Sequence, residues 1–388
     1  VVPHHRLEKG EDGGLVPASP LQEPLVIRPT SETIIGEALS NWVNSYRDLP
    51  YKLNQWANVM RWEMRPRLFL RTSEFLWQEG HNCFATAEEA REDSLKMCDV
   101  YADLAENDLA IPVIKGEKTP DERFPGAIAT FTIEAMMQDG KALQAGTSHD
   151  LGQTFSKSAN IRYQGQDGQE HFAWTTSWGV STRTIGGLIM VHGDDDGIIL
   201  PPNIAPRQVV IIPVIKGEDS AEDTLAHCRK IAAKLGDAGV RAYVNDSEDR
   251  TPDKMWGAIK KGVPLRVEAG MREVEADSLT CVRRDLGKES KMTVSVSDFI
   301  SKAPALLKEM QDGLYKAAKD RMMSQIHEVK TLEDVDAFFA SSQTGFTKTS
   351  VNVWQDPRFE ELQKKYAITP RCLPFEDEGQ MVIIGRSY

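Results

Sequence analysis

Cysteine is scarce in this sequence, and long apolar runs are missing. Among 388 residues there are five cysteines, none of them in a C-x-x-C pair, so their spacing indicates neither a disulfide framework nor a zinc site. The longest apolar stretches, such as VVIIPVI at 209–215, are far too short to span a bilayer, and the start of the sequence lacks a signal-like pattern. We therefore expect a soluble cytoplasmic protein with reduced thiols and no membrane contact.

An excess of positive charge is missing too. The 46 lysines and arginines are outnumbered by 58 acidic residues, which gives a net charge of −12. Because phosphate contacts need clustered basic side chains, this average argues against a nucleic-acid-binding protein. Residues 207–302 differ from the average, with 17 basic and 16 acidic side chains. Charge alone thus neither indicates nor excludes binding to RNA.

What the sequence does contain is a hairpin rich in arginine and aromatic residues. The stretch RWEMRPRLFLRTSEFLWQEGH at 61–81 alternates, turns at MRPR and alternates again, which predicts two antiparallel strands joined by a loop. Side chains of equal parity share one face of the second strand: Arg71, Ser73, Phe75, Trp77 and Glu79. An ordinary core would not contain such a face, because unpaired buried charges are costly. A guanidinium, two rings and a carboxylate suit a ligand that is part nucleotide and part small amine.

The hairpin resembles motif two of class II aminoacyl-tRNA synthetases, in the form found in prolyl-tRNA synthetases of the archaeal and eukaryotic-like type. Further segments are similar to the same family: LQAGTSH at 143–149, TTSWGVSTRTIGG at 175–187 and KKGVPLRVEAGMRE at 260–273. The resemblance implies an α/β (α+β) fold in three parts. These are a class II antiparallel-sheet catalytic domain at 1–206, an α/β anticodon-binding domain at 207–302 and a small α/β C-terminal domain at 303–388.

The activity implied by the resemblance is the ATP-dependent attachment of proline to tRNA(Pro) through a prolyl-adenylate, with ATP and Mg²⁺ as cofactors. Three arginines would be catalytic: Arg61, Arg71 and Arg183. The implied ATP-binding residues are Arg61, Glu63, Arg71, Phe75, Gln144, Thr147 and Arg183. The implied proline-binding residues are Thr30, Glu32, Arg61, Trp77, Glu79, His149, Ser177 and Trp178.

Some of these residues also have plain structural explanations. The segment LVIR at 25–28 predicts a short strand, and a helix is expected from about Thr30 to Tyr46 with Glu32 in its first turn. An acidic residue there can simply complement the helix dipole, while Thr30 caps the helix. A lone histidine such as His149 is more often structural than catalytic. The resemblance favours the functional reading in each case.

The resemblance also implies a tRNA contact in the second part of the chain. The residues that would meet the anticodon bases of tRNA(Pro) are Lys261, Arg266, Arg272 and Glu273. A solvated basic strand edge is the alternative for each of them taken singly.

No metal site is expected in the protein itself. The C-terminal domain of the family often carries four zinc-binding cysteines, of which only Cys372 is present here, so we expect no zinc. His192 and Asp194 lack the spacing of metal ligands, and we interpret them as structural.

Two gaps bear on this interpretation. Residues 1–24 show no periodicity and are assigned no structure, and class II motif one is missing, so we expect either a fragment or a longer natural protein. Because motif one builds the dimer interface in the family, a homodimer is expected for the full-length protein. The rival hypotheses are a non-catalytic RNA-binding relative, which should have lost one of the three arginines, and a threonyl or histidyl synthetase, whose pocket motifs we do not find.

Overall fold

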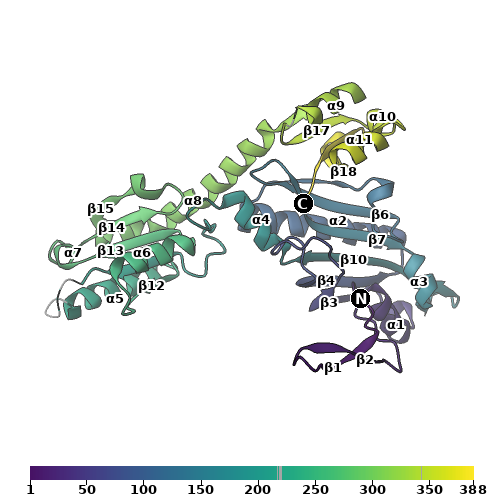
Figure 1. Ribbon diagram of the computed structural model, residues 1–388, viewed down its shortest axis with the longest axis horizontal. Helices are drawn as coiled ribbons and strands as arrows, with labels where there is room; N and C mark the ends of the chain where they lie inside the picture. The colour runs from purple at the N-terminus through teal and green to yellow at the C-terminus, as the bar shows by residue number, and fades with distance from the viewer. Residues whose placement is uncertain (216, 218–220, 342) are drawn as a thin grey trace.

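One sheet of ten strands runs through most of the molecule. The computed structural model describes residues 1–215, 217, 221–341 and 343–388 (Figure 1). The strands of this sheet follow one another in space in the order β16 (Ile326–Glu328), β17 (Phe346–Ser350), β19 (Met381–Arg386), β18 (Ile368–Pro374), β5 (Val113–Glu117), β6 (Ala129–Met136), β7 (Ala142–Gly152), β10 (Trp174–Ser181), β4 (Glu74–Phe84) and β3 (Tyr51–Met60). From β3 to β5 every pairing is antiparallel, as expected for a class II catalytic sheet.

Helix α2 covers one face of this antiparallel part. The helices of residues 1–206 are α1 (Glu32–Trp42), α2 (Ala87–Asp103), α3 (Thr154–Ala159) and α4 (Arg183–His192). On α2, Cys98 and Tyr101 pack against Phe131 of β6 and Trp178 of β10 in one buried cluster. Because strand side chains alternate between faces, the neighbours of Phe131 and Trp178 along each strand point to the opposite face.

The hairpin begins earlier than predicted. Its first strand is β3, and β3 pairs with β4 from Tyr51 opposite Cys83 to Met60 opposite Glu74. Residues 61–73 form the connection, so Arg71 and Ser73 do not belong to the strand, and the prediction that they share its face was wrong. Phe75 and Trp77 do share that face, and their rings are in edge-to-face contact.

The N-terminal segment also differs from the prediction. Strands β1 (His5–Lys9) and β2 (Leu15–Pro20) pair in a hairpin within residues 1–24, where no structure was expected. The predicted strand at 25–28 is absent from the described residues, and α1 is shorter than the predicted helix at both ends. The short strands β8 (Arg162–Gln164) and β9 (Glu170–Phe172) form a further hairpin.

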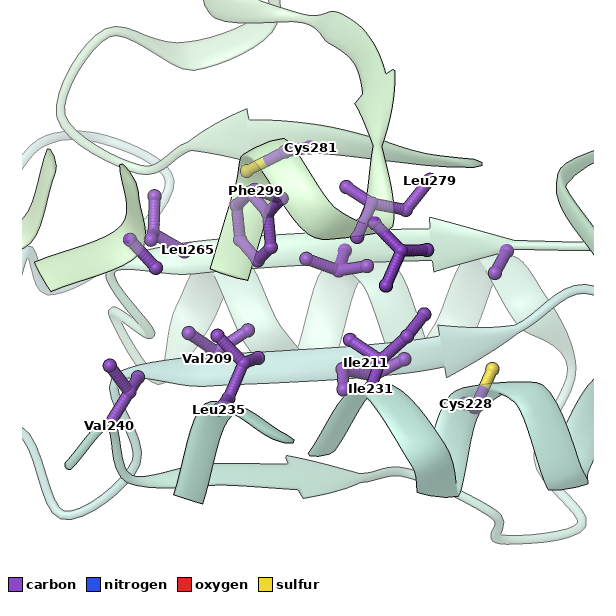
Figure 2. Packing of buried hydrophobic residues seen from close by; sticks show 14 of the residues in the cluster. Val209, Ile211, Cys228, Ile231, Leu235, Val240, Leu265, Leu279, Cys281 and Phe299 are labelled. Atoms are coloured by element: carbon purple, nitrogen blue, oxygen red, sulfur yellow. The ribbon is translucent and has the colours of Figure 1, made fainter. Parts of the chain in front are cut away.

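A second sheet stands apart at one end of the elongated molecule (Figure 1). Its order is β12 (Ala242–Val244), β11 (Val209–Pro213), β13 (Leu265–Ala269), β14 (Ser278–Arg283) and β15 (Met292–Ser295), with α5 (Ala221–Asp237), α6 (Thr251–Lys260) and α7 (Met271–Glu275) around it. The pairs β11–β12 and β11–β13 are parallel. Figure 2 shows its core, where Val209 and Ile211 of β11 lie against Ile231 and Leu235 of α5.

Helix α8 (Val296–Ser324) connects this second unit to the last part of the chain. It begins before residue 303, so residue 302 lies inside a helix. Figure 1 shows α8 running from the second unit to α9 (Leu332–Ala340), α10 (Val351–Trp354) and α11 (Phe359–Tyr366). Strand β18 then pairs with β5 and joins the C-terminal strands to the first sheet. Throughout the part of the chain that the structure describes, no helix has both the length and the apolar character needed to cross a membrane.

Candidate active site

A cavity lies on the face of the first sheet opposite α2. Four residues stand side by side across it from β6 to β4: Thr130, His149, Ser177 and His81. The cavity above them has a volume of about 320 Å³. It is lined by most of the residues that the sequence singles out: Thr30, Glu32, Arg61, Phe75, Trp77, Glu79, Gln144, Thr147, His149, Ser177, Trp178 and Arg183. The exceptions are Glu63 and Arg71, which do not belong to the lining.

Carboxylates mark one end of the cavity. Glu79 is 2% exposed, and its carboxylate has three hydrogen-bonding partners: Ser31 Oγ, Gln55 Nε2 and His81 Nε2. Burial raises the pKa of Glu79, but hydrogen bonds from these partners outweigh burial and hold the pKa below its usual range. Glu79 is therefore an ionised, well-oriented carboxylate, suited to a cationic amine.

Glu32 lies beside this carboxylate and is also buried. The hydroxyl of Thr30 donates a hydrogen bond to its carboxylate. The alternative explanation for Thr30, that it caps α1, is therefore wrong. The N-cap residue is Ser31, whose hydroxyl donates to Glu79 rather than to the helix. The side chains of this segment are turned toward the cavity rather than used for capping.

Arginines line the cavity as well. The guanidinium of Arg61 lies over the rings of Phe75 and Trp77, 5.2 and 5.6 Å from their centroids, and its Nε donates to the carbonyl of Pro29 at 2.9 Å. Arg183, the first residue of α4, donates to the carbonyl of Leu70 at 3.1 Å. Burial and the charges of Arg71 and Arg61 lower the pKa of Arg183, so like charges are gathered here. Such a cluster favours an anionic ligand.

Arg71 is engaged elsewhere. Its Nε and Nη2 donate to the main-chain oxygen of Tyr388 at 3.0 and 2.6 Å, and its Nη1 lies 3.9 Å from Glu63 Oε2. Arg71 remains near enough to influence Arg183 electrostatically. A direct contact between Arg71 and a ligand in the cavity requires its side chain to leave Tyr388.

Two tryptophans differ in how they meet the cavity. Trp77 lies in its wall, whereas the ring of Trp178 belongs to the cluster under α2, edge-on to Tyr101. A Cβ atom on Gly80 would lie 2.1 Å from the Trp178 ring, so glycine is required there to let the ring lie over the neighbouring strand β4. Within the described residues, the indole nitrogen of Trp77 and the hydroxyl of Ser177 are buried without a hydrogen-bond partner. Each of these donors can hydrogen-bond to a ligand or to water in the cavity.

His149 is held as a neutral ring. It stacks on Phe124 with centroids 4.7 Å apart, and its Nδ1 lies 3.1 Å from Thr130 Oγ1. Burial, with a smaller effect of His81, lowers the pKa of His149 to about 3. The hydroxyl of Thr130 accepts a hydrogen bond from the main-chain N–H of Phe124 and can donate its own proton to Nδ1. Nε2 then carries the ring proton of His149.

The pKa of His149 predicts an acid-sensitive fold. Its ordinary value is 6.5, so below that pH the unfolded chain binds a proton that the folded chain does not, and stability falls as the pH falls toward 3. Between pH 7.5 and 5.8 this group should cost the wild type about 1 kcal/mol, and His149→Gln should remove that loss. Urea unfolding at the two pH values measures it; equal losses in both proteins would contradict the assignment. The pH stays above the isoelectric point, near 5.3.

One wall of the cavity was not indicated by any sequence pattern. It is formed by the segment after β5 with Lys118, Glu122, Arg123, Phe124 and Pro125; Thr130, Ala145, Gly146, Gly179 and Ser181 complete the lining. The ammonium group of Lys118 lies 2.8 Å from Glu134 Oε1, and Arg371 Nη2 of β18 lies 2.9 Å from Glu134 Oε2. Glu134 is fully buried. The wall is therefore tied to the C-terminal strands through a buried network of three charges.

The residues predicted to meet an anticodon are only partly brought together. Arg272 and Glu273 line a second cavity of about 320 Å³ with Glu268 and Lys291. Arg266 lies on β13 and pairs with Glu268 at 2.9 Å. Lys261 comes just before β13, whereas Arg272 comes just after it, so Lys261 lies at the opposite end of that strand from this cavity.

His192 and Asp194 have structural partners. His192 Nε2 lies 3.0 Å from the carbonyl of Leu109, and Asp194 forms an ion pair with Arg284. In the portion of the chain described by the structure, no group of three or more His, Cys, Asp or Glu side chains could hold a metal ion.

Comparison with known proteins agrees with this geometry. Residues 16–192 match the tRNA synthetase class II core domain (G, H, P, S and T), and residues 208–306 match the anticodon binding domain. The Proline–tRNA ligase of Bdellovibrio bacteriovorus is 49% identical over 100% of this chain and 79% of its own length. The chain belongs to the prolyl-tRNA synthetase family. Another Proline–tRNA ligase, from Paramagnetospirillum magneticum, is 51% identical with the same coverage of both chains.

A solved structure of the family has the same fold. The prolyl-tRNA synthetase of Cryptosporidium parvum, crystallised with L-proline and AMP, superimposes with a TM-score of 0.88 at 37% identity, over 100% of this chain and 81% of that one. A second structure of that enzyme contains halofuginone and AMPPNP and has a TM-score of 0.87. The predicted class II fold and family membership are thus confirmed.

Proposed function

We propose that this chain attaches proline to tRNA(Pro) in two steps at the cavity. In the first, a carboxylate oxygen of proline attacks the α-phosphorus of ATP; the new P–O bond forms prolyl-adenylate, and the bond to the bridging oxygen breaks to release pyrophosphate. In the second, the terminal ribose hydroxyl of tRNA attacks the prolyl carbonyl carbon, AMP leaves with the electron pair of the broken C–O bond, and the hydroxyl proton passes to the leaving phosphate or to solvent. Protein groups hold and neutralise the reactants in both steps.

The observation that carries the proposal is the polarity of the cavity. Arg61 lies over Trp77, two residues from Glu79 on the same face of β4, and it donates to the carbonyl of Pro29 just before Thr30 and Glu32; its charge also acts on Arg183. A zwitterionic amino acid fits this order, with its ammonium group at the two glutamates and its carboxylate at Arg61. The reacting carboxylate then lies between the acidic end and the arginine cluster, where the phosphates of ATP would bind.

The remaining lining residues have matching roles. In this proposal adenine packs against Phe75, the outer phosphates bind at Arg183, and the rest of ATP lies beside Gln144 and Thr147, all of which line the cavity. Arg71 and Glu63 join the phosphates only if Arg71 leaves Tyr388. Trp77, His149 and Ser177 would surround the proline ring. Mg²⁺ arrives with ATP and is held chiefly by phosphate oxygens, as is usual for this ion.

The second unit would read the tRNA. We assign residues 207–302 to anticodon binding, with Arg272 and Glu273 at the second cavity, and Arg266 beside it. Lys261, at the other end of β13, would meet a different part of the tRNA. The first unit would be the catalytic domain, and residues after 302 would brace its cavity wall.

ATP–pyrophosphate exchange with each of the twenty amino acids tests the activation step. Proline should support exchange, and alanine should support it more weakly, because a site for a small apolar ring gains only about 1–3 kcal/mol per methylene. Bulky amino acids should not. No exchange with any amino acid would overturn the proposed function, and equal rates with alanine and a bulky amino acid would overturn the account of the pocket.

We also propose that the cytoplasmic enzyme acts as a homodimer. The edge strand β3, the connection after it and the start of β4 expose large apolar side chains: Trp56, Trp62, Met64, Leu68 and Leu76. Unpaired strand edges and apolar patches of this kind suit a second copy of the chain. Light scattering on the full-length protein should give twice the monomer mass; a monomer at micromolar concentration would contradict the proposal.

A further inference from the structure

An ion pair joins the second unit to the end of α4. Arg284 follows β14, and Asp194 comes two residues after α4. The Nη1 and Nη2 atoms of Arg284 lie 2.7 and 2.6 Å from Asp194 Oδ2 and Oδ1, a bidentate pair. The same guanidinium donates to the carbonyls of Gly197 and Ile259, and its side chain is only 7% exposed. Its hydrogen bonds thus reach both units at once.

The main chains of the two units touch around this pair. A Cβ atom on Gly197 would lie 2.8 Å from Lys260 Cα, and one on Gly262 would lie 2.6 Å from the carbonyl oxygen of Ile198. The N–H of Leu200 donates to the carbonyl of Gly262 at 3.2 Å. Backbone contacts this close prevent the two units from shifting against each other. The ion pair therefore lies at a fixed contact between the units, which we call the joint.

Helix α4 connects this joint to the cavity. Its first residue is Arg183 in the cavity lining, and its ten residues span about 15 Å. The helix is held along its length, because a Cβ atom on Gly187 would lie 2.9 Å from the side chain of Leu143 and Arg321 of α8 donates to the carbonyl of Val191 at 2.8 Å. One rigid element therefore has a phosphate-binding residue at one end and the interdomain pair at the other.

We propose that the Asp194–Arg284 pair is a positioning contact for the transfer of proline to tRNA, because it fixes the anticodon-binding domain relative to α4 and the cavity. The inference rests on the proposed function and goes beyond it. Proline and ATP are small and bind within the cavity, so adenylate formation does not depend on where the second domain lies. A tRNA must reach both domains at once, and a shift of about 1 Å in a bound reactant can cost a hundredfold in rate.

The test compares Asp194→Asn with a matched control in the full-length protein. Asp194 accepts hydrogen bonds from the N–H groups of Asp196 and Gly197, and asparagine keeps an oxygen for them. Asparagine loses, however, the negative charge that pairs with Arg284. The control is Asp285→Asn, because Asp285 pairs with the adjacent Arg283 within one domain at 2.7 Å. Each protein is assayed for proline-dependent ATP–pyrophosphate exchange, for aminoacylation of tRNA(Pro) and for aminoacylation of an acceptor-stem minihelix without the anticodon arm.

Asp194→Asn should lower kcat/KM for full tRNA about tenfold or more, with exchange and minihelix charging within about twofold of wild type. Asp194→Glu should recover part of the loss, and Asp285→Asn should behave as wild type. Unchanged tRNA charging in Asp194→Asn, a parallel fall in exchange, or an equal loss in Asp285→Asn would each overturn the proposal. Absence of exchange in the wild type would instead overturn the proposed function itself.

Discussion

Replacement of Arg61 by alanine should lower kcat for proline-dependent ATP–pyrophosphate exchange by about 10²–10³-fold. The guanidinium is held by Phe75, Trp77 and the carbonyl of Pro29, so it is oriented before substrates bind. In the proposed function it would meet the proline carboxylate and the α-phosphate, where negative charge accumulates as the new bond forms. Alanine removes that charge together with the hydrogen bond to Pro29.

Arg67→Ala is the matched control for this experiment. Arg67 belongs to the same connection, but its guanidinium lies over the ring of Tyr388, outside the cavity lining. The Arg67→Ala protein should keep a rate of ATP–pyrophosphate exchange within about threefold of wild type. Arg61→Lys separates charge from shape, because an ammonium group cannot make the bidentate contact of a guanidinium, and an intermediate rate is expected. If Arg61→Ala and Arg67→Ala lose the same activity, the role assigned to Arg61 is wrong.

Glu134→Gln should lower the free energy of unfolding by about 3–5 kcal/mol. Glu134 is fully buried, and it neutralises Lys118 and Arg371, whose side chains are 3% and 7% exposed. Glutamine has nearly the same shape but no charge, so two cations would remain buried without a counter-ion. Urea unfolding followed by tryptophan fluorescence measures the loss.

An exposed pair provides the comparison for Glu134. Lys115 and Asp99 lie 2.8 Å apart with side chains 43% and 64% exposed, so Asp99→Asn should cost less than about 1 kcal/mol. Replacing all three buried charges together, with Glu134→Leu, Lys118→Met and Arg371→Met, should recover much of the stability lost in Glu134→Gln, since no charge is then left unpaired. Equal losses from Glu134→Gln and Asp99→Asn would show that the network is not what stabilises this region.

The sequence predicts the cavity face of β4 well but not the limits of the hairpin. Alternation from Phe75 to Glu79 is a local property, and the strand retains it. Arg71 continues the same alternation by coincidence, because the strand can extend only as far as its partner, and β3 ends at Met60 opposite Glu74. The start of the hairpin depends on pairing across the sheet rather than on the arginine-rich stretch itself.

Other features leave little trace in the sequence. Strand β1 is exposed at every residue, so no alternation of buried and exposed positions announces the N-terminal hairpin. The wall at 118–125 was missed because its lysine donates to Glu134 and to the main-chain carbonyl of Arg371, and that arrangement exists only in the folded chain. Family resemblance identified residues that line the cavity, whereas it said nothing of the residues that brace them.

The pairing of β18 with β5 also has a consequence for synthesis on the ribosome. Lys118 donates to the carbonyl of Arg371, 253 residues later in the chain. At about 5–20 residues per second, translation of that interval lasts on the order of tens of seconds. During this time the edge of β5 has no neighbour and Glu134 lacks one of its two counter-ions. For the part of this interval that follows Arg183, every residue that lines the cavity has been made while the sheet is still incomplete, and chaperone binding should be concentrated there.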